Sequence, residues 1–123
     1  MGGWIAVALG GALGAALRYG VLLAFARPGS GAVPWHTLGV NVAGSFLLGL
    51  LMAALPADHA AERWQLLLGV GVLGGFTTFS TFSLETVSLV QAGAPVTAAA
   101  YVAMSLAGGL IAAAAGYALG RML

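Results

Sequence analysis

An all-α integral membrane protein of four transmembrane helices is predicted by three features of this sequence. First, the chain is apolar: of its 123 residues 61% are hydrophobic and 6% are charged, and the mean hydropathy is +1.04. A soluble domain usually carries charge on about a quarter of its residues, so lipid must surround most of this surface. Second, the apolar residues fall into four runs of the length that crosses a bilayer as a helix. Third, only short polar breaks separate these runs.

The four runs predict a single transmembrane domain over residues 1–123, with helices at about 4–25, 35–55, 64–90 and 95–119. Residues 27–31 read as a turn. Pro34 suits the first turn of the second helix, Pro56 ends that helix, and Pro95 starts the fourth. The first run lacks a preceding positive segment, so we interpret it as a membrane helix rather than a cleaved signal peptide. Four crossings place both termini on one side of the membrane.

The third run is too long and too rich in glycine and hydroxyl residues for a simple membrane helix. Its middle reads GVGVLGGFTTFSTFS, and the pair Gly74-Gly75 favours a break near 74–77. Ten helical residues before this pair would rise about 15 Å, half of a roughly 30 Å hydrocarbon core. Unwound backbone at that depth is tolerated only inside protein or along a water-filled path, so the break indicates function. A continuous, glycine-rich packing helix is the alternative interpretation.

The arginines give no preferred orientation in the membrane. The side of the termini carries Arg63 and Arg121, and the opposite side carries Arg27 with Arg18 within two turns. The positive-inside rule therefore selects neither orientation, and chains can insert both ways. An antiparallel homodimer with a two-fold axis in the membrane plane would result. A bundle this thin is also unable to enclose a pore alone, so we expect oligomers.

Several classes of function are disfavoured by the composition. The net charge is +1 and the chain has no lysine, so we expect no nucleic-acid partner. It also has no cysteine, which removes disulfides and thiolate metal sites. We expect no enzyme, because no nucleophile–base pair is visible. His36 and His59 fall at predicted helix ends, where an interfacial or solvated histidine is ordinary.

Uncharged polar residues recur every four positions on two helices and so share one face of each. Thr37, Asn41 and Ser45 mark the second helix, and Thr97, Tyr101 and Ser105 mark the fourth. Such groups can replace the water of an anion without holding it as tightly as a fixed charge would. Hydrogen bonding between helices is the alternative, and for Ser45 and Thr97 both readings stay open. Asn41 is costlier to bury, which favours function there.

The sharpest motif follows the predicted break. Phe79 and Phe82 are three residues apart on one helical face, and Ser80 and Thr81 lie between them. Aromatic rings carry partial positive charge at their edges, so edge-on rings can favour a small anion. The two hydroxyls can add donors. Two phenylalanines in lipid are otherwise ordinary core or lipid contacts.

Three segments, GGALGAALRY (10–19), TLGVNVAGSFLLG (37–49) and GGFTTFSTFSLE (74–85), together resemble the Fluc (CrcB) fluoride channel family. The resemblance covers essentially the whole chain. It implies an antiparallel dual-topology homodimer in the plasma or inner membrane, which exports cytoplasmic fluoride down its gradient through two pathways.

The resemblance also implies roles for individual residues. Phe79 and Phe82 match the family's pore phenylalanines, Asn41 matches the pore asparagine, and Tyr101 and Ser105 match the start of a polar track. Thr37, Ser80 and Thr81 are supporting candidates. Gly74 and Thr77 match positions whose backbone carbonyls hold a central sodium ion that is not transported, and Arg18 matches an arginine near the end of the first helix. Partial negative charge at a half-helix C-terminus suits such a cation.

Two points are left open by the sequence. The family's polar track continues with hydroxyls where this chain has Gly109 and Ala113, and the role of Glu85 is undetermined. The main alternative function is a small antiparallel multidrug or cation transporter. That class needs a membrane carboxylate, which by resemblance lies in its first helix, whereas the only acid within a predicted helix interior here is Glu85 of the third. A passive membrane assembly subunit would leave the broken helix without a purpose.

Overall fold

A computed structural model describes residues 2–25, 31–56 and 58–123 of the chain. Helix α1 spans Gly2–Phe25 and α2 spans Trp35–Ala54. The third span begins with α3 (His59–Trp64), continues through η1 (Gln65–Leu73) and α4 (Gly74–Phe76), and resumes as α5 (Phe79–Gln91). Helix α6 spans Pro95–Gly120. The turn predicted at 27–31 lies outside the described residues except for Gly31.

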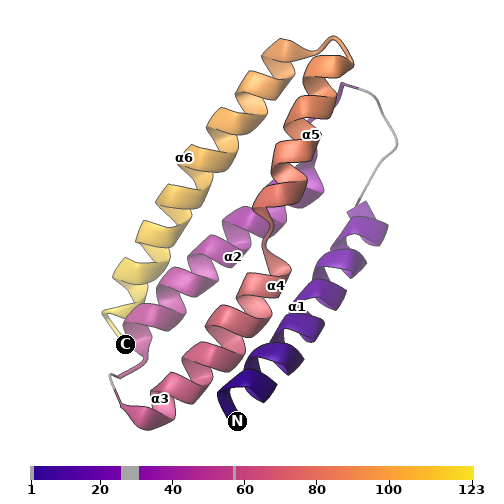
Figure 1. The fold of residues 1–123 in the computed structure, drawn as a ribbon. Helices are drawn as coiled ribbons and strands as arrows, with labels where there is room; N and C mark the ends of the chain where they lie inside the picture. Colours follow the sequence, from indigo (N-terminus) through magenta and orange to yellow (C-terminus); the bar gives the residue numbers. More distant parts are fainter. Residues whose placement is uncertain (1, 26–30, 57) are drawn as a thin grey trace.

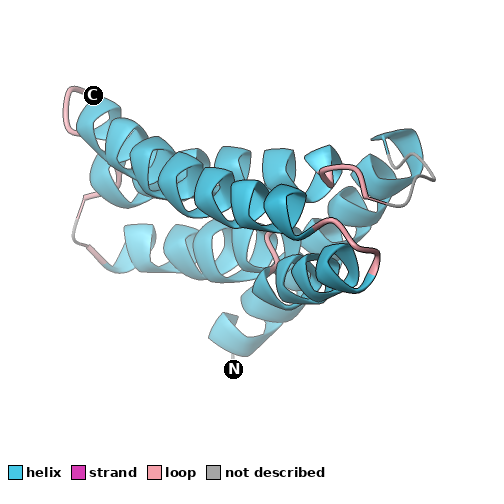
Figure 2. Cartoon of the chain, turned by 90° about the horizontal axis from the view of Figure 1, so that it is seen from above, coloured by secondary structure: helices cyan, strands magenta, loops and turns pink. Residues whose placement is uncertain are grey.

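The described part of the chain is all-helical and has no strand (Figure 1, Figure 2). Four helical spans, Gly2–Phe25, Trp35–Ala54, His59–Gln91 and Pro95–Gly120, are long and apolar enough to cross a membrane. The two termini lie at the same end of the bundle in Figure 1, as four crossings require. Few side chains on these spans are buried in the single chain, which fits a protein whose solvent is lipid.

The third span starts five residues earlier than predicted. Asp58 adopts an extended conformation, and its side chain accepts a hydrogen bond of 2.7 Å from the Ala61 amide. This N-cap satisfies a free amide of the first turn, so the helix begins at His59 rather than at Trp64. Helix α6 begins at Pro95, as predicted, where the missing N–H of proline has no cost.

The two halves of the third span pack against different neighbours. Elements η1 and α4 lie along α1, whereas α5 lies against α6, and α2 packs along most of α6. These crossings are close because glycines form them. A Cβ atom at Gly14 would collide with the Val72 carbonyl, and one at Gly116 would collide with the Phe46 carbonyl. The small residues therefore act in packing, as in other membrane helix pairs.

Helical geometry is lost between α4 and α5, but not at the glycine pair that we expected to unwind. Gly74 and Gly75 are helical, and Thr77 and Thr78 are extended, with φ/ψ of −82°/158° and −154°/122°. Gly75 packs against Gly11 of α1, so its missing side chain serves close contact rather than unwinding. Upstream, η1 has wide π-helical turns, and the Gly74 amide donates to the Gly69 carbonyl five residues back.

Candidate functional site

The extended residues are held by one side chain from the neighbouring α2. Asn41 Nδ2 donates to the Thr78 carbonyl at 2.9 Å, and the Thr78 amide donates to Asn41 Oδ1 at 2.8 Å. The Thr78 amide no longer has a helical acceptor, and Asn41 supplies one. The Thr78 carbonyl, at the N-cap of α5, accepts from Asn41 in addition to the first turn of that helix. An unpaired buried amide or carbonyl costs about 1–3 kcal/mol. Asn41 therefore stabilises the interruption, and its second Nδ2 proton remains available to another acceptor.

Two backbone carbonyls lose their helical donors at the same place. In a continuous α-helix the Gly74 carbonyl would accept from the Thr78 amide, and the Thr77 carbonyl from the Thr81 amide. The Thr78 amide donates to Asn41 instead, and the Thr81 amide donates to Thr78 Oγ1 at 3.2 Å. The carbonyls of Gly74 and Thr77 thus lie at the C-terminal end of a half-helix, where partial negative charge accumulates.

A cavity of about 280 Å³ lies beside the interruption and brings several predicted residues together. Ser105 Oγ is buried there and has no hydrogen-bond partner among the described residues, so its proton is free for a ligand. The residues that line the cavity are Asn41, Gly44, Ser45, Leu48, Gly69, Leu73, Gly74, Thr77, Thr78, Phe79, Phe82, Ser105 and Leu106.

Three aromatic rings form a row from this cavity towards α6. The centroids of Phe79 and Phe82 are 5.5 Å apart at 49°, and those of Phe82 and Tyr101 are 5.2 Å apart at 57°. In such a tilted pair the positive edge of one ring is turned towards the negative face of its neighbour, an arrangement that aromatic pairs favour. Phe82 is buried, whereas Phe79 is 74% exposed in the single chain.

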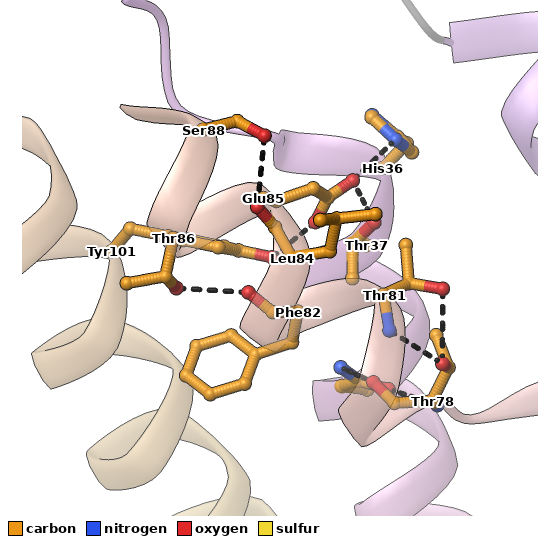
Figure 3. A network of polar contacts seen from close by, with 11 residues as sticks. His36, Thr37, Thr78, Thr81, Phe82, Leu84, Glu85, Thr86, Ser88 and Tyr101 are labelled. Carbon is orange, nitrogen blue, oxygen red and sulfur yellow. Dashed lines mark hydrogen bonds and ion pairs between the residues drawn. The ribbon is translucent and has the colours of Figure 1, made fainter. Parts of the chain in front are cut away.

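Glu85 is the centre of a polar network that joins α2, α5 and α6 (Figure 3). Its Oε1 accepts from Thr37 Oγ1 at 2.8 Å and lies 3.3 Å from His36 Nε2. Its Oε2 accepts from the Tyr101 hydroxyl at 2.7 Å. Thr37 and Tyr101 are both buried, and each donates its hydroxyl proton to this carboxylate.

The structure thus separates the predicted site residues into groups. Asn41, Phe79, Phe82, Ser105, Gly74 and Thr77 share the cavity beside the interruption, and Thr37 and Tyr101 bind Glu85. Thr81 and Arg18 line a second cavity of about 180 Å³ together with His36. Ser80 is exposed, and its hydroxyl lies 3.3 Å from Thr78 Oγ1.

Two residues that were not among the predicted site residues are central here. Thr78 is bound by Asn41 and caps α5, because its Oγ1 accepts from the Thr81 amide. Thr is a preferred N-cap residue directly before a helix, so the sequence contained a signal for this role of Thr78. His36 contacts Glu85 across two helices, and no local pattern predicts a contact between residues so distant in sequence.

Gly109 and Ala113 lie where α6 packs on α2. A Cβ atom at Gly49 of α2 would collide with the Ala113 carbonyl, so Gly49 permits this close contact. A Cβ atom at Gly109 would lie 3.6 Å from Ser45 Oγ, an ordinary contact distance, and nothing in the structure explains the missing hydroxyls.

These features define a multi-pass membrane protein in which the interrupted third span and its neighbours line a polar and aromatic cavity. Comparison with known sequences then gives the family. Residues 5–117 match the family described as CrcB-like protein, Camphor Resistance (CrcB), and the chain belongs to it.

Named relatives agree with this assignment over most of their length. The chain is 48% identical over 118 residues to the fluoride-specific ion channel FluC of Chelativorans sp. (strain BNC1), which covers 95% of this chain and 94% of the relative. It is 52% identical over 106 residues to the protein of the same name from Novosphingobium aromaticivorans, covering 85% and 84%. The protein of that name from Agrobacterium fabrum is 48% identical over 118 residues, covering 95% and 94%.

The bonds between Asn41 and Thr78 predict a stability effect. In Asn41→Asp the side chain still accepts from the Thr78 amide but no longer donates to the Thr78 carbonyl. We expect a loss of about 1–3 kcal/mol in the free energy of unfolding, measured by tryptophan fluorescence in detergent. Ser45→Ala is the control, because Ser45 Oγ donates to the Asn41 backbone carbonyl, a weak intrahelical bond. Equal destabilisation by the two variants would contradict the role of Asn41.

Proposed function

We propose that this chain forms a fluoride-selective channel, in which cytoplasmic fluoride leaves the cell down its gradient through the plasma or inner membrane. The observation that carries the proposal is the cavity beside the interruption, which brings the Asn41 amide, the unpaired Ser105 hydroxyl and the rings of Phe79 and Phe82 together. The names of the relatives, fluoride-specific ion channels, support the choice of anion.

The chemistry of this cavity suits a strongly hydrated anion. Fluoride must exchange its water for many close donors, yet a fixed positive charge at mid-path would hold it too tightly to leave. None of the residues that line the cavity is charged. The free proton of Asn41 Nδ2, the hydroxyl of Ser105 and the positive ring edges of Phe79 and Phe82 offer partial charges instead. Thr81 and Arg18 line the adjoining cavity, which we assign to the entrance of the path.

The proposed working unit is an antiparallel homodimer with two pathways. In a single chain, Gly74 and Phe79 are exposed next to the extended backbone. Non-helical backbone near the middle of a bilayer is stable only where protein or a water-filled path covers it. A second, inverted copy would cover this surface in both chains at once. The sequence places Arg18 and Arg27 towards one side and Arg63 and Arg121 towards the other, and this balance supports insertion in both orientations.

A structural sodium ion on the two-fold axis fits the carbonyls of Gly74 and Thr77. Both oxygens have lost their helical donors, because the Thr78 and Thr81 amides donate to side chains. Two carbonyls from each of two chains give four neutral oxygens of the kind that hard cations prefer. A bound sodium ion would supply a positive potential near the middle of the membrane, and the Asn41–Thr78 bonds would keep its ligands in place.

The transporter alternative lacks support from the structure. Proton-coupled cation export needs an accessible membrane carboxylate. Glu85 has its two oxygens bound by Thr37 and Tyr101, with His36 also in contact. A carboxylate held in this way is poorly placed to bind and release a cationic substrate.

The pore assignment predicts a selective loss of flux. The double variant Phe79→Ile/Phe82→Ile keeps the apolar bulk but loses the ring edges. Fluoride efflux from liposomes should therefore fall at least about tenfold. The wild-type protein should release fluoride and retain chloride. Phe46→Ile is the control, because Phe46 does not line the cavity. Wild-type flux in a folded double variant would mean that these rings are ordinary core.

The antiparallel arrangement predicts labelling from both sides of the membrane. The chain has no cysteine, so Ala92→Cys between α5 and α6 and Ala60→Cys in α3 each give one exposed thiol, at opposite ends. An impermeant maleimide added outside intact cells should label about half of each variant. Complete labelling of one variant together with none of the other would show a single orientation and exclude the antiparallel dimer.

The sodium assignment predicts dependence on the cation but little dependence on the Thr77 side chain. Exchange of sodium for the bulky N-methylglucamine cation should weaken the dimer and fluoride flux together, measured by size exclusion and liposome efflux. Thr77→Ser should be mild, because the proposed ligand is the backbone carbonyl and the hydroxyl bonds to Leu73. If neither the dimer nor the fluoride flux changes when sodium is replaced, the structural sodium ion is excluded.

A further inference from the structure

The contact between His36 and Glu85 is not needed for the pore chemistry above, and it has its own geometry. His36 Nε2 lies 3.3 Å from Glu85 Oε1, and the two side chains are only 18% and 20% exposed. Both residues line a cavity of about 840 Å³ at the end of the bundle where α2 begins. His36 also lines the adjoining cavity with Arg18 and Thr81.

We propose that His36 and Glu85 form a proton-sensitive charge pair at the entrance of the ion path, in which protonation of His36 offsets the carboxylate charge and speeds fluoride entrance. This inference rests on the proposed channel function. His36 acts through the local charge and is a positioning residue, because nothing places it in contact with the ion.

The charges around this pair explain the direction of the effect. Among the described residues, the titratable or charged groups that face it are Arg18 and Tyr19 of α1 and Tyr101 of α6, and α5 carries no other charged side chain. With neutral His36, the charges of Glu85 and Arg18 cancel. With protonated His36 the entrance has a net charge of +1, which favours an approaching anion.

Histidine is the side chain whose charge ordinarily changes between about pH 5 and 8. The stimulation should therefore be present at the acidic end of this range and lost as the pH rises. A unit charge about 10 Å from the ion in a partly aqueous site changes the rate of entrance roughly threefold to tenfold. The Glu85 network would also hold the imidazole in place, because Thr37 and Tyr101 fix the carboxylate that it contacts.

Electrical recording of the reconstituted protein in planar bilayers, with equal sodium fluoride and equal pH on both sides, tests the proposal. Undissociated HF carries no current, so its passive leak does not contribute. The wild-type fluoride current should rise roughly threefold to tenfold between about pH 8 and pH 5.5. His36→Gln should give a low current without this rise, and His36→Arg a high current without it. His59→Gln is the matched control and should follow the wild type, since His59 is fully exposed at the opposite end.

A wild-type current that does not change with pH, or a pH profile that survives in His36→Gln, would overturn the charge pair and leave the channel function intact. Absence of fluoride current at every pH in the folded wild-type protein would instead overturn the proposed function. His36→Asn serves as a second neutral variant if His36→Gln fails to fold.

Discussion

The constraint on which this structure depends is that backbone polar groups in hydrocarbon must find partners within the protein. The third span breaks this rule locally, because Thr77 and Thr78 are extended between two helices. Asn41 of α2 supplies the acceptor that the Thr78 amide has lost, and it also donates to the Thr78 carbonyl. The Thr78 side chain then caps α5. The carbonyls of Gly74 and Thr77 remain without helical donors, and the proposed sodium ion is a chemically suitable partner for them.

The second constraint concerns charge, which the protein keeps away from the interruption. The residues that line the 280 Å³ cavity are uncharged, whereas Glu85 lies on α5 beyond the aromatic row. Its negative charge would oppose an anion, yet Thr37 and Tyr101 donate to it directly and His36 adjoins it. The same carboxylate joins three helices, so it is structural as well as electrostatic. A removable positive charge at His36 is therefore consistent with a path that has no fixed charge at its centre.

Much of the fold could be predicted from the sequence, because lipid solvation forces apolar runs of fixed length. Prolines placed the starts of α2 and α6 correctly, whereas the Asp58 cap was overlooked and the start of α3 was placed at Trp64. The position of the interruption was predicted only approximately, since Gly75 serves contact with Gly11 and leaves the unwinding to Thr77 and Thr78. The membership of Asn41 and Ser105 in one cavity follows from helix packing, and so does the contact of His36 with Glu85. No local pattern contains that information.

The supply of free protons near the interruption explains why the proposed pore needs two chains. Ser45 Oγ already donates to the Asn41 carbonyl, and Gly109 and Ala113 carry no hydroxyl. In one chain, the free donors at the cavity are therefore the second Nδ2 proton of Asn41 and the hydroxyl of Ser105. Two donors are too few to replace the tightly held water of fluoride. The ring of Phe79 is 74% exposed, so it is free to contribute to the pathway of a second chain. In an antiparallel pair it would lie over the partner's cavity and add a positive edge, so that each pathway is completed by the other chain.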